Sequence, residues 1–367
     1  MVDPRKLPDM PALMIAGPGE LHEEDLEVLG RQIIAHYGDV WTDIHDRVVD
    51  RTGELLGCAD RPYLMPGTGT LGLDAAVANL FDEGDRVLVP NTGFFGNRLM
   101  EVARAHRLQV DELEVPIDAA VDPEAVAGRI EGVDGVLMVH VETTTGIRHP
   151  IEEVAKIAKT AGALFMVDGI ASVGGELVSV DRDGIDVLVT GTQKGLEAPP
   201  GVGIVALGPS GRAKVDARTE PPRTWYLELD RWDWYRREWP HHPHPVTMPT
   251  NIFLALAASI ERILEAGLED WVGRRSELAK KLRQGLTDLG LGLVAPAHYE
   301  ANLVTAAYVD DPPSVVKHLI VNEGIAISGG LAPLATQVIR IGLMGRTATE
   351  EWVERVVAGV GRALEAA

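Results

Sequence analysis

Two charged side chains follow apolar runs in the middle of the chain. Asp168 comes directly after the run ALFMV, and Lys194 lies just beyond IDVLVTG, in TGTQKG. If these runs are strands of an open α/β sheet, both residues lie at the strand ends where such sheets bind ligands. A lysine with a packed stem and a partly desolvated amine has a lowered pKa and can form a Schiff base. An aspartate facing a pyridine nitrogen keeps that nitrogen protonated, so the ring can accept electrons.

A glycine-rich turn precedes both residues. Residues 67 to 72, Gly-Thr-Gly-Thr-Leu-Gly, match the G-x-G-x-x-G pattern of dinucleotide-binding folds. That pattern needs a clean apolar strand before it and an acidic residue about 20 positions later. Here Pro62 and Pro66 precede the turn, and the next apolar run ends in proline and asparagine with no carboxylate. A nicotinamide dehydrogenase is therefore a weak alternative.

The start of the helix that follows this turn suits a phosphate. Backbone N–H groups at Thr68, Gly69 and Thr70, together with the positive end of the helix dipole, can hold an anion. An ordinary tight turn capped by one of the threonines is the simpler interpretation of the motif taken alone. A phosphate turn, an aspartate and a lysine in this order together describe a site for pyridoxal 5'-phosphate (PLP).

The composition narrows the class of protein and its partners. The chain has 367 residues, of which 46% are hydrophobic and 24% charged, enough for sizeable buried cores. Its net charge of -21 repels nucleic acid and anionic membranes, so we expect neither as a partner. The sequence shows no apolar stretch long enough to span a bilayer and no signal peptide, and its single cysteine cannot form an internal disulfide. We therefore expect a cytoplasmic protein.

Apolar runs alternate with amphipathic stretches between residues 64 and 208, which is the pattern of repeated strand–helix–strand units. Several runs are apolar on both faces, as strands are when helices cover both sides of a mainly parallel sheet. One intervening helix is predicted between Pro150 and Gly162, residues typical of a helix start and stop. The predicted strands cover residues 85 to 90, 109 to 115, 135 to 141, 163 to 169, 185 to 191 and 202 to 208.

The C-terminal part of the chain has a different organisation. Residues 212 to 248 hold four of the seven tryptophans and a cluster of prolines, which predicts an irregular excursion across a surface or interface. A long helical pattern follows from 251 to 290, and short strands and a terminal amphipathic helix come after it. We expect an N-terminal segment of residues 1 to 20 that lines the site and a large PLP-binding domain of residues 21 to 250. Residues 251 to 367 then form a small α+β domain that includes the long helix.

The segments around the two charged residues resemble those of a known enzyme family. Residues 167 to 175, VDGIASVGG, and 184 to 203, GIDVLVTGTQKGLEAPPGVG, are similar to the signature of class V, fold-type I PLP-dependent aminotransferases, closest to the alanine–glyoxylate and serine–glyoxylate group. Less specific similarity continues along the chain in AGPGE, GTGT, NTGFFGNR, HVETTTG, WYLELD, PVTMPTN, SGGLAP and VIRIGLMG. The resemblance implies an α/β fold with a mainly parallel, seven-stranded sheet between helices and a smaller C-terminal α+β domain. It also implies transfer of an amino group from a small amino acid, such as serine or alanine, to a 2-oxo acid such as glyoxylate or pyruvate.

The resemblance assigns roles to the residues of the PLP site. Lys194 forms the Schiff base with the cofactor and then acts as general base, and Asp168 pairs with the pyridine nitrogen. Phe95 stands where the family usually has a tryptophan stacked on the ring; a phenyl face can still stack, with less area, and it also borders the substrate. The other residues implied to hold PLP are Thr68, Gly69, Thr70 and Gln193 at the phosphate, Thr143 near the ring hydroxyl and Ile170 under the opposite face.

Further residues are implied at the substrate and at a partner subunit. Arg340 matches the family arginine that binds the substrate carboxylate, and Gly19 lies in an N-terminal loop that lines the pocket. We expect the neighbouring Glu20 to face water. Thr247 resembles a threonine that reaches the phosphate in the partner subunit, which implies a homodimer with shared sites. His244 stands where the family often has a tyrosine with a similar phosphate contact.

A histidine cluster in the same segment is open to two interpretations. His241, His242 and His244 could bind a metal ion. Flanking prolines and the absence of nearby cysteine or aspartate favour an ordinary loop, so we expect no metal site.

Other activities stay open at this point. Epimerase, β-lyase and decarboxylase reactions begin from the same cofactor adduct, and no motif separates them from transamination. A cysteine desulfurase is disfavoured because it needs a reactive cysteine well after the lysine, whereas Cys58 lies far before it. A non-catalytic scaffold is disfavoured because it has no physical need for Asp168, Gln193, Lys194 and Arg340 together.

Overall fold

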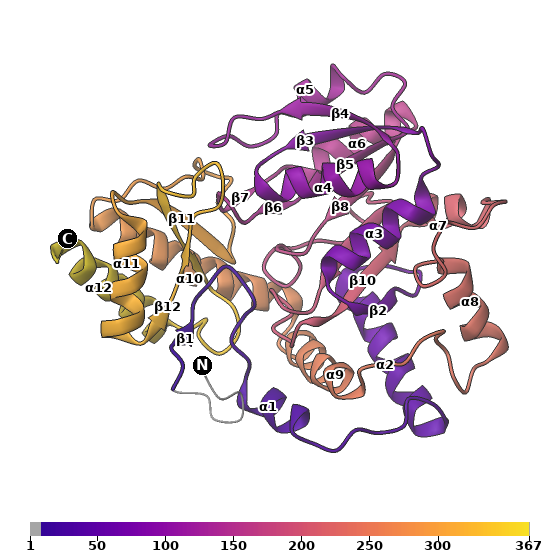
Figure 1. The fold of residues 1–367 in the computed structure, drawn as a ribbon, viewed down its shortest axis with the longest axis horizontal. Helices are drawn as coiled ribbons and strands as arrows, with labels where there is room; N and C mark the ends of the chain where they lie inside the picture. The colour runs from indigo at the N-terminus through magenta and orange to yellow at the C-terminus, as the bar shows by residue number, and fades with distance from the viewer. Residues whose placement is uncertain (1–8, 367) are drawn as a thin grey trace.

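A sheet of seven strands forms the centre of the larger part of the protein (Figure 1), in a computed structural model that describes residues 9 to 366. Four of the six neighbouring strand pairs are parallel, and only β10 runs antiparallel to its two neighbours. The expected α/β fold with a mainly parallel sheet is therefore confirmed. In spatial order the strands are β2 (Tyr63–Gly67), β10 (Gly201–Leu207), β9 (Val187–Gly191), β8 (Leu164–Asp168), β5 (Gly135–Val139), β3 (Arg86–Asn91) and β4 (Gln109–Glu114).

The position of each strand in the sheet explains its sequence. Every residue of β5 and β9 is buried, and a strand buried on both faces needs a continuous apolar run. β2 carries Pro66 and lies at the edge of the sheet, where a missing backbone N–H is tolerated. The prolines that argued against a dinucleotide-binding strand are thus compatible with an edge strand.

Helices flank this sheet (Figure 1). The helix predicted between Pro150 and Gly162 is α6, with Gly162 in a left-handed conformation at its end. The helices of this part are α1 (Glu23–Leu29), α2 (Asp39–Leu56), α3 (Gly69–Leu80), α4 (Phe94–Ala105), α5 (Pro123–Ala127), α6 (Ile151–Ala161), α7 (Pro209–Asp216), α8 (Leu229–Glu238) and α9 (Thr250–Glu265).

The tryptophan-rich excursion is more regular than predicted. It begins within α7 and contains α8, whose Trp232 is buried while Trp234 is 42% exposed. Charged residues outnumber apolar ones in α8, so the apolar periodicity that reveals most helices is weak here. The expectation of an irregular segment was wrong for this part of it.

The predicted long helix from 251 to 290 is two helices. α9 ends at Glu265 and α10 (Leu268–Asp288) begins after Gly267, whose φ of 77° lies in the left-handed region. A helix cannot continue through that conformation. Apolar side chains of α9 pack into the core of the larger part, whereas those near the end of α10 pack into a second core.

The smaller part is built around a three-stranded antiparallel sheet, β11 (Val304–Tyr308), β14 (Val338–Gly342) and β13 (Ser328–Gly329). α10, α11 (Pro312–His318) and α12 (Glu350–Glu365) pack with it, and a π-helical turn, Leu319–Glu323, follows α11. The N-terminal strand β1 (Ala12–Leu13) pairs with β12 (Ile325–Ala326) of this part (Figure 1). The chain after β1 is thereby led back toward the larger sheet. None of the helices in residues 9 to 366 is long and apolar enough to cross a membrane.

Candidate active site

Lys194 lies three residues beyond β9, in a loop that meets the N-terminal segment. Its Nζ donates a hydrogen bond to the carbonyl of Ala16, and its side chain leaves no room for a Cβ at Gly17. Gly17 has a φ of 103°, which also favours glycine. Burial, with a smaller contribution from the positive charge of Arg340, lowers the pKa of Lys194 to about 8. The amine is therefore much more easily deprotonated than an ordinary lysine.

Asp168 is the last residue of β8 and is only 3% exposed. One of its oxygens accepts a hydrogen bond from the backbone N–H of Ile170, at 3.0 Å. Burial raises the pKa of Asp168 to about 6, because the charged carboxylate is poorly solvated there. Such a carboxylate gains from a cationic partner, and Asp168 and Lys194 line the same pocket.

The pocket beside these two residues gathers most of the predicted cofactor ring contacts. The space left open in it is only about 20 Å3. Its lining residues are Phe95, Val139, Val141, Thr143, Asp168, Ile170, Ala171 and Lys194.

The predicted phosphate turn begins α3. Thr68 is the residue that precedes the helix, and its side chain makes no capping hydrogen bond. The first backbone N–H groups of a helix have no partner within the helix. Gly69 and Thr70 thus present their N–H groups at the positive end of the α3 dipole.

Gln193 lies next to this turn. Its Oε1 is buried and has no hydrogen-bond partner among the described residues. A Cβ on Gly191 would lie 2.8 Å from Gln193 Oε1 and 3.0 Å from the backbone nitrogen of Gly69, so only glycine keeps this space open. An unpartnered buried amide beside free helix N–H groups fits the predicted place of a phosphate.

Phe95 is positioned by a residue that the sequence analysis missed. Glu142 is fully buried, and its Oε2 accepts hydrogen bonds from the backbone N–H groups of Phe95 and Gly96, at 3.0 and 3.2 Å. Its Oε1 accepts from the backbone and hydroxyl of Thr144. Glu142 thereby fixes the first turn of α4 against the strand ends. The sequence signal for Glu142 was an acidic residue inside the otherwise uncharged run HVETTTG, directly after an apolar strand.

Arg340 reaches from the smaller part to the rim of the pocket. It lies in β14, is 7% exposed, and donates to the carbonyls of Gly329 and Thr143, at 2.8 and 3.0 Å. Among residues 9 to 366 its hydrogen-bond partners are carbonyls, and no carboxylate forms an ion pair with it. Gly19 donates its backbone N–H to the carbonyl of Gln193, at 2.9 Å, so the N-terminal loop does close over the lysine loop.

The carboxylate of Glu20 and the thiol of Cys58 both lie outside this pocket. Glu20 does not face water as expected: it pairs with Arg346 and accepts from the backbone N–H of Leu13, which ties the N-terminal loop to the smaller part. Cys58 packs against the core and donates its Sγ–H to the carbonyl of Leu207, and burial raises its pKa to about 12. It is not placed to act as a nucleophile.

Thr247 and His244 are placed differently from one another. Thr247 is exposed in the single chain. A residue that contacts another subunit must be exposed when that subunit is absent. His244 is 0% exposed and its Nε2 accepts a hydrogen bond from the indole N–H of Trp41, at 2.8 Å. The predicted phosphate contact of His244 is therefore corrected, because its ring lies in the interior rather than on a surface that a partner could meet. His242 and His244 lie in the loop between α8 and α9, as expected, and both rings contact His36.

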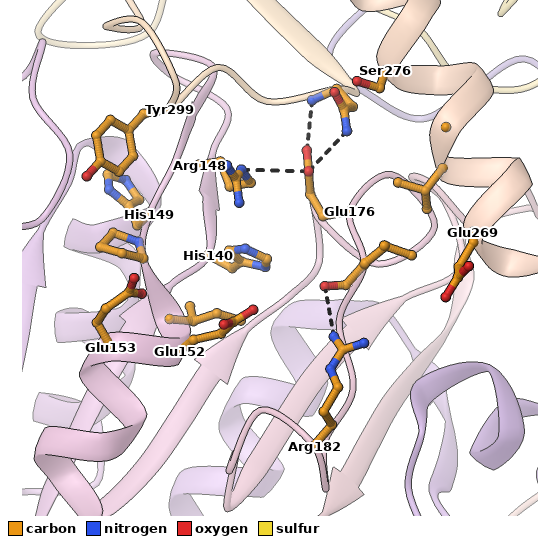
Figure 2. Close-up of a pocket in the computed structure, with 16 residues that line it drawn as sticks. His140, Arg148, His149, Glu152, Glu153, Glu176, Arg182, Glu269, Ser276 and Tyr299 are labelled. Atoms are coloured by element: carbon orange, nitrogen blue, oxygen red, sulfur yellow. Dashed lines mark hydrogen bonds and ion pairs between the residues drawn. The ribbon is translucent and has the colours of Figure 1, made fainter.

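A second cavity, of about 570 Å3, is lined by His140, Glu176 and Ser276 among other residues (Figure 2). His140 lines it, while the neighbouring Val139 and Val141 line the Lys194 pocket, as expected for side chains that alternate along an extended chain. Glu176 in its wall accepts hydrogen bonds from Asn302, and burial raises the pKa of Glu176 to about 7. None of the predicted site residues lines this cavity, whereas five of them line the Lys194 pocket.

Solved structures that superpose well on this chain include aminotransferases. An alanine–glyoxylate aminotransferase from Nostoc sp. superposes with a TM-score of 0.93 at 27% sequence identity, covering 99% of this chain and 97% of that one. The chain therefore has the fold of the fold-type I, PLP-dependent aminotransferases.

The sequence comparisons identify the family. The aminotransferase class-V model matches residues 32–356. The (S)-ureidoglycine–glyoxylate transaminase of Bacillus subtilis is 30% identical, covering 95% of this chain and 89% of the relative. The alanine–glyoxylate aminotransferase of Oryctolagus cuniculus is 31% identical, covering 96% and 92%. The chain belongs to the class-V aminotransferases, and it is a transaminase that transfers an amino group to a 2-oxo acid.

Proposed function

We propose that this transaminase uses PLP held beside Lys194 to move the amino group of a small amino acid, of the serine or alanine type, to glyoxylate or pyruvate. The observation that carries the proposal is the convergence of three separate elements. Asp168 at the end of β8 and Lys194 beyond β9 line one pocket, and Arg340 of β14 reaches the carbonyl of Thr143 at its rim. Glyoxylate is the acceptor named for both relatives described above.

The residues present fit PLP. Thr68, Gly69 and Thr70 offer the start of α3 to the phosphate, with the amide of Gln193 beside them. Phe95 and Ile170 offer apolar surfaces to the two faces of the ring, with Thr143 at its edge. When bound, PLP supplies the carbonyl carbon that receives the amino group and a ring that takes up electron density.

Asp168 and Lys194 divide the proton handling between them. The buried carboxylate of Asp168 holds a proton on the ring nitrogen, because a cation beside it removes the cost of its burial. Lys194 Nζ would take the proton from the substrate Cα and deliver it to the cofactor carbon that receives the amino group, a task suited to an amine whose pKa is lowered to about 8. To do so, its side chain turns away from the carbonyl of Ala16.

Arg340 orients the substrate. The guanidinium is held at two carbonyls, which fixes its plane, and its remaining N–H groups can bind the α-carboxylate as a fork. Apart from Asp168 and Lys194, the side chains that line the pocket are apolar or hydroxylic. This lining favours a donor with a small, uncharged side chain.

We also propose a homodimer in which Thr247 of each subunit completes the phosphate site of the other. The exposure of Thr247 supports this arrangement, as do the exposed tryptophans Trp225, Trp234 and Trp239 in the segment that precedes it in the sequence. Thr247 is not among the residues that line the Lys194 pocket of its own chain.

The visible absorption of bound PLP tests the proposed reaction. The purified chain, incubated with PLP and freed of excess, is expected to be yellow. Serine or alanine without an acceptor is expected to bleach the colour, and glyoxylate or pyruvate to restore it. A protein that binds PLP but is bleached only by other donors contradicts the proposed substrate class, and a protein that does not retain PLP contradicts the cofactor site.

A further inference from the structure

Three histidines from two distant segments meet near the start of α2. His36 precedes α2, whereas His242 and His244 follow α8. One nitrogen from each ring lies within 4.8 Å of the other two. The ring centroids of His242 and His244 are 4.6 Å apart, and His36 lies 5.1 Å from His242 and 5.5 Å from His244. The three rings are close enough to share one ion.

The hydrogen bonding of these rings is incomplete. The Nδ1 atom of each of the three histidines is buried and has no hydrogen-bond partner in the part of the chain that the structure describes. Buried polar atoms in proteins nearly always have a partner, and a group of orphans at one place calls for a specific explanation. A bound cation would account for all three at once.

The two segments are already held together without an ion. The backbone N–H of Gly38 donates to the carbonyl of His241, at 2.8 Å, and the hydroxyl of Thr42 donates to the carbonyl of Pro240. Two of the three proposed ligands, His36 and His242, are only partly buried. The ligands are thus brought together before an ion arrives, so little ordering opposes binding.

The ligand set selects a class of metal. No carboxylate or thiol of residues 9 to 366 completes the group, which consists of nitrogen donors alone. Three imidazoles with an open fourth position suit Zn²⁺ and the neighbouring transition metals Co²⁺, Ni²⁺ and Cu²⁺. Mg²⁺ and Ca²⁺ prefer oxygen ligands and are excluded by the same reasoning.

We propose that His36, His242 and His244 bind one divalent transition-metal ion, with zinc the best-suited metal, and that the ion joins the segment before α2 to the segment after α8. A neutral ring has one lone pair, and that of His244 faces the indole N–H of Trp41 in this structure. Ligation by His244 therefore breaks this hydrogen bond. A change in the fluorescence of Trp41 is a direct consequence.

The experiment uses the full-length, untagged chain with its cofactor, dialysed against a chelator and titrated with Zn²⁺ by calorimetry. His36→Gln and His242→Gln each remove one partly exposed ligand. His241→Gln is the matched control, because His241 is exposed, stacks on Trp239 and is outside the three-ring group. We expect one ion per chain for the wild type and the control, and affinity weakened by about 100-fold in the two ligand variants.

Two further measurements separate this site from adventitious binding. Zn²⁺ is expected to raise the thermal midpoint of the wild type and of His241→Gln but not of the ligand variants, and Mg²⁺ and Ca²⁺ are expected to leave it unchanged. Trp41→Phe should still bind zinc while losing the fluorescence response. Equal zinc stoichiometry and affinity in His36→Gln, His242→Gln and the wild type would overturn the proposal, as would a wild type that binds no zinc.

Discussion

Lys194 and Asp168 have pKa values displaced by the same physical cause in opposite directions. Burial disfavours the charged form of either group, so it lowers the pKa of the lysine to about 8 and raises that of the aspartate to about 6. Burial of the two charged groups destabilises the protein without its cofactor, but the shifted pKa values suit the reaction. Proton transfer on a pyridine cofactor requires a base whose pKa lies near neutral pH and a buried anion that is stabilised by a cationic ring nitrogen.

Replacing Lys194 tests the first of these roles. Lys194→Ala is expected to lower the rate of transamination by at least about a thousandfold, because the base at Cα is lost. The unfolding midpoint should not fall, since a buried ammonium destabilises the fold. Lys156→Ala, an exposed lysine on α6, is the matched control and should retain activity. Steady-state kinetics measure the loss of activity, and thermal unfolding measures the midpoint.

The uptake of PLP by the cofactor-free protein should depend on pH. Only the unprotonated amine of Lys194 attacks the PLP aldehyde, and its pKa is lowered from 10.5 to about 8. The uptake rate is therefore small below pH 8 and levels off above it, with a midpoint near 8. Stopped-flow absorbance across this range measures the midpoint. A midpoint near 10.5 would show that the pocket does not desolvate the amine.

The elements around the site are held by contacts that join strand ends to helix starts. Glu142, in the short strand β6 (Val141–Glu142), accepts two backbone hydrogen bonds from the first turn of α4. That turn carries Phe95. A buried carboxylate at a helix N-terminus is favoured by the helix dipole as well as by these bonds.

Removing this carboxylate should loosen α4. Glu142→Ala leaves the N–H groups of Phe95, Gly96 and Thr144 without their acceptor, at roughly 1 kcal/mol or more each, so we expect a loss of about 3 kcal/mol in the free energy of unfolding. PLP affinity should fall as Phe95 shifts. Glu142→Gln, which keeps one acceptor, should lose less, and Glu101→Ala on the exposed side of α4 should change neither quantity. Denaturant unfolding and PLP titration measure them.

The break between α9 and α10 provides a second test at this scale. Gly267→Ala places a Cβ on a residue with a φ of 77° and should destabilise the protein by about 1 kcal/mol. Gly273 lies inside α10, and nothing lies within 4 Å of an added Cβ there. Gly273→Ala should therefore stabilise the protein by about 0.5–1 kcal/mol. Opposite signs in denaturant unfolding confirm the break, and equal signs contradict it.

Across the whole molecule, the site depends on three regions far apart in the chain. The N-terminal segment contributes the contacts of Ala16 and Gly19 and is anchored to the smaller part through β1 and Glu20. The larger sheet contributes Asp168 and Lys194, and β14 contributes Arg340. Movement of the smaller part would therefore alter the substrate site and the lysine environment together.

A mixed dimer tests whether the site also depends on a second subunit. Lys194→Ala alone is expected to be inactive, and Thr247→Ala alone to bind PLP weakly. In a heterodimer of the two variants, one site combines Lys194 of one subunit with Thr247 of the other and is wild type. Mixing and refolding the two variants together should then restore up to about half of the activity per heterodimer. No recovery, in a sample shown by light scattering to be dimeric, contradicts the shared site.

The sequence by itself determined the features that depend on neighbouring residues. Apolar runs defined strands such as β5 and β9, because a strand covered on both faces must be apolar at each position. Asp168 and Lys194 could be recognised because they directly follow such runs, and the start of α3 because its glycines and threonines are contiguous. The break at Gly267 was also marked locally, by a glycine after a helical stretch, and was overlooked.

Only the tertiary structure decided which distant residues meet. Glu142 contacts Phe95 across 47 positions, and Trp41 contacts His244 across 203, so the buried position of His244 had no local signal. His36 likewise lies beside His242 and His244 although about 200 positions separate them in the sequence. Local spacing sets which face of a strand or helix a side chain occupies, but the order of strands and the packing of loops set its partners. Contacts of this kind depend on the whole chain folding around them.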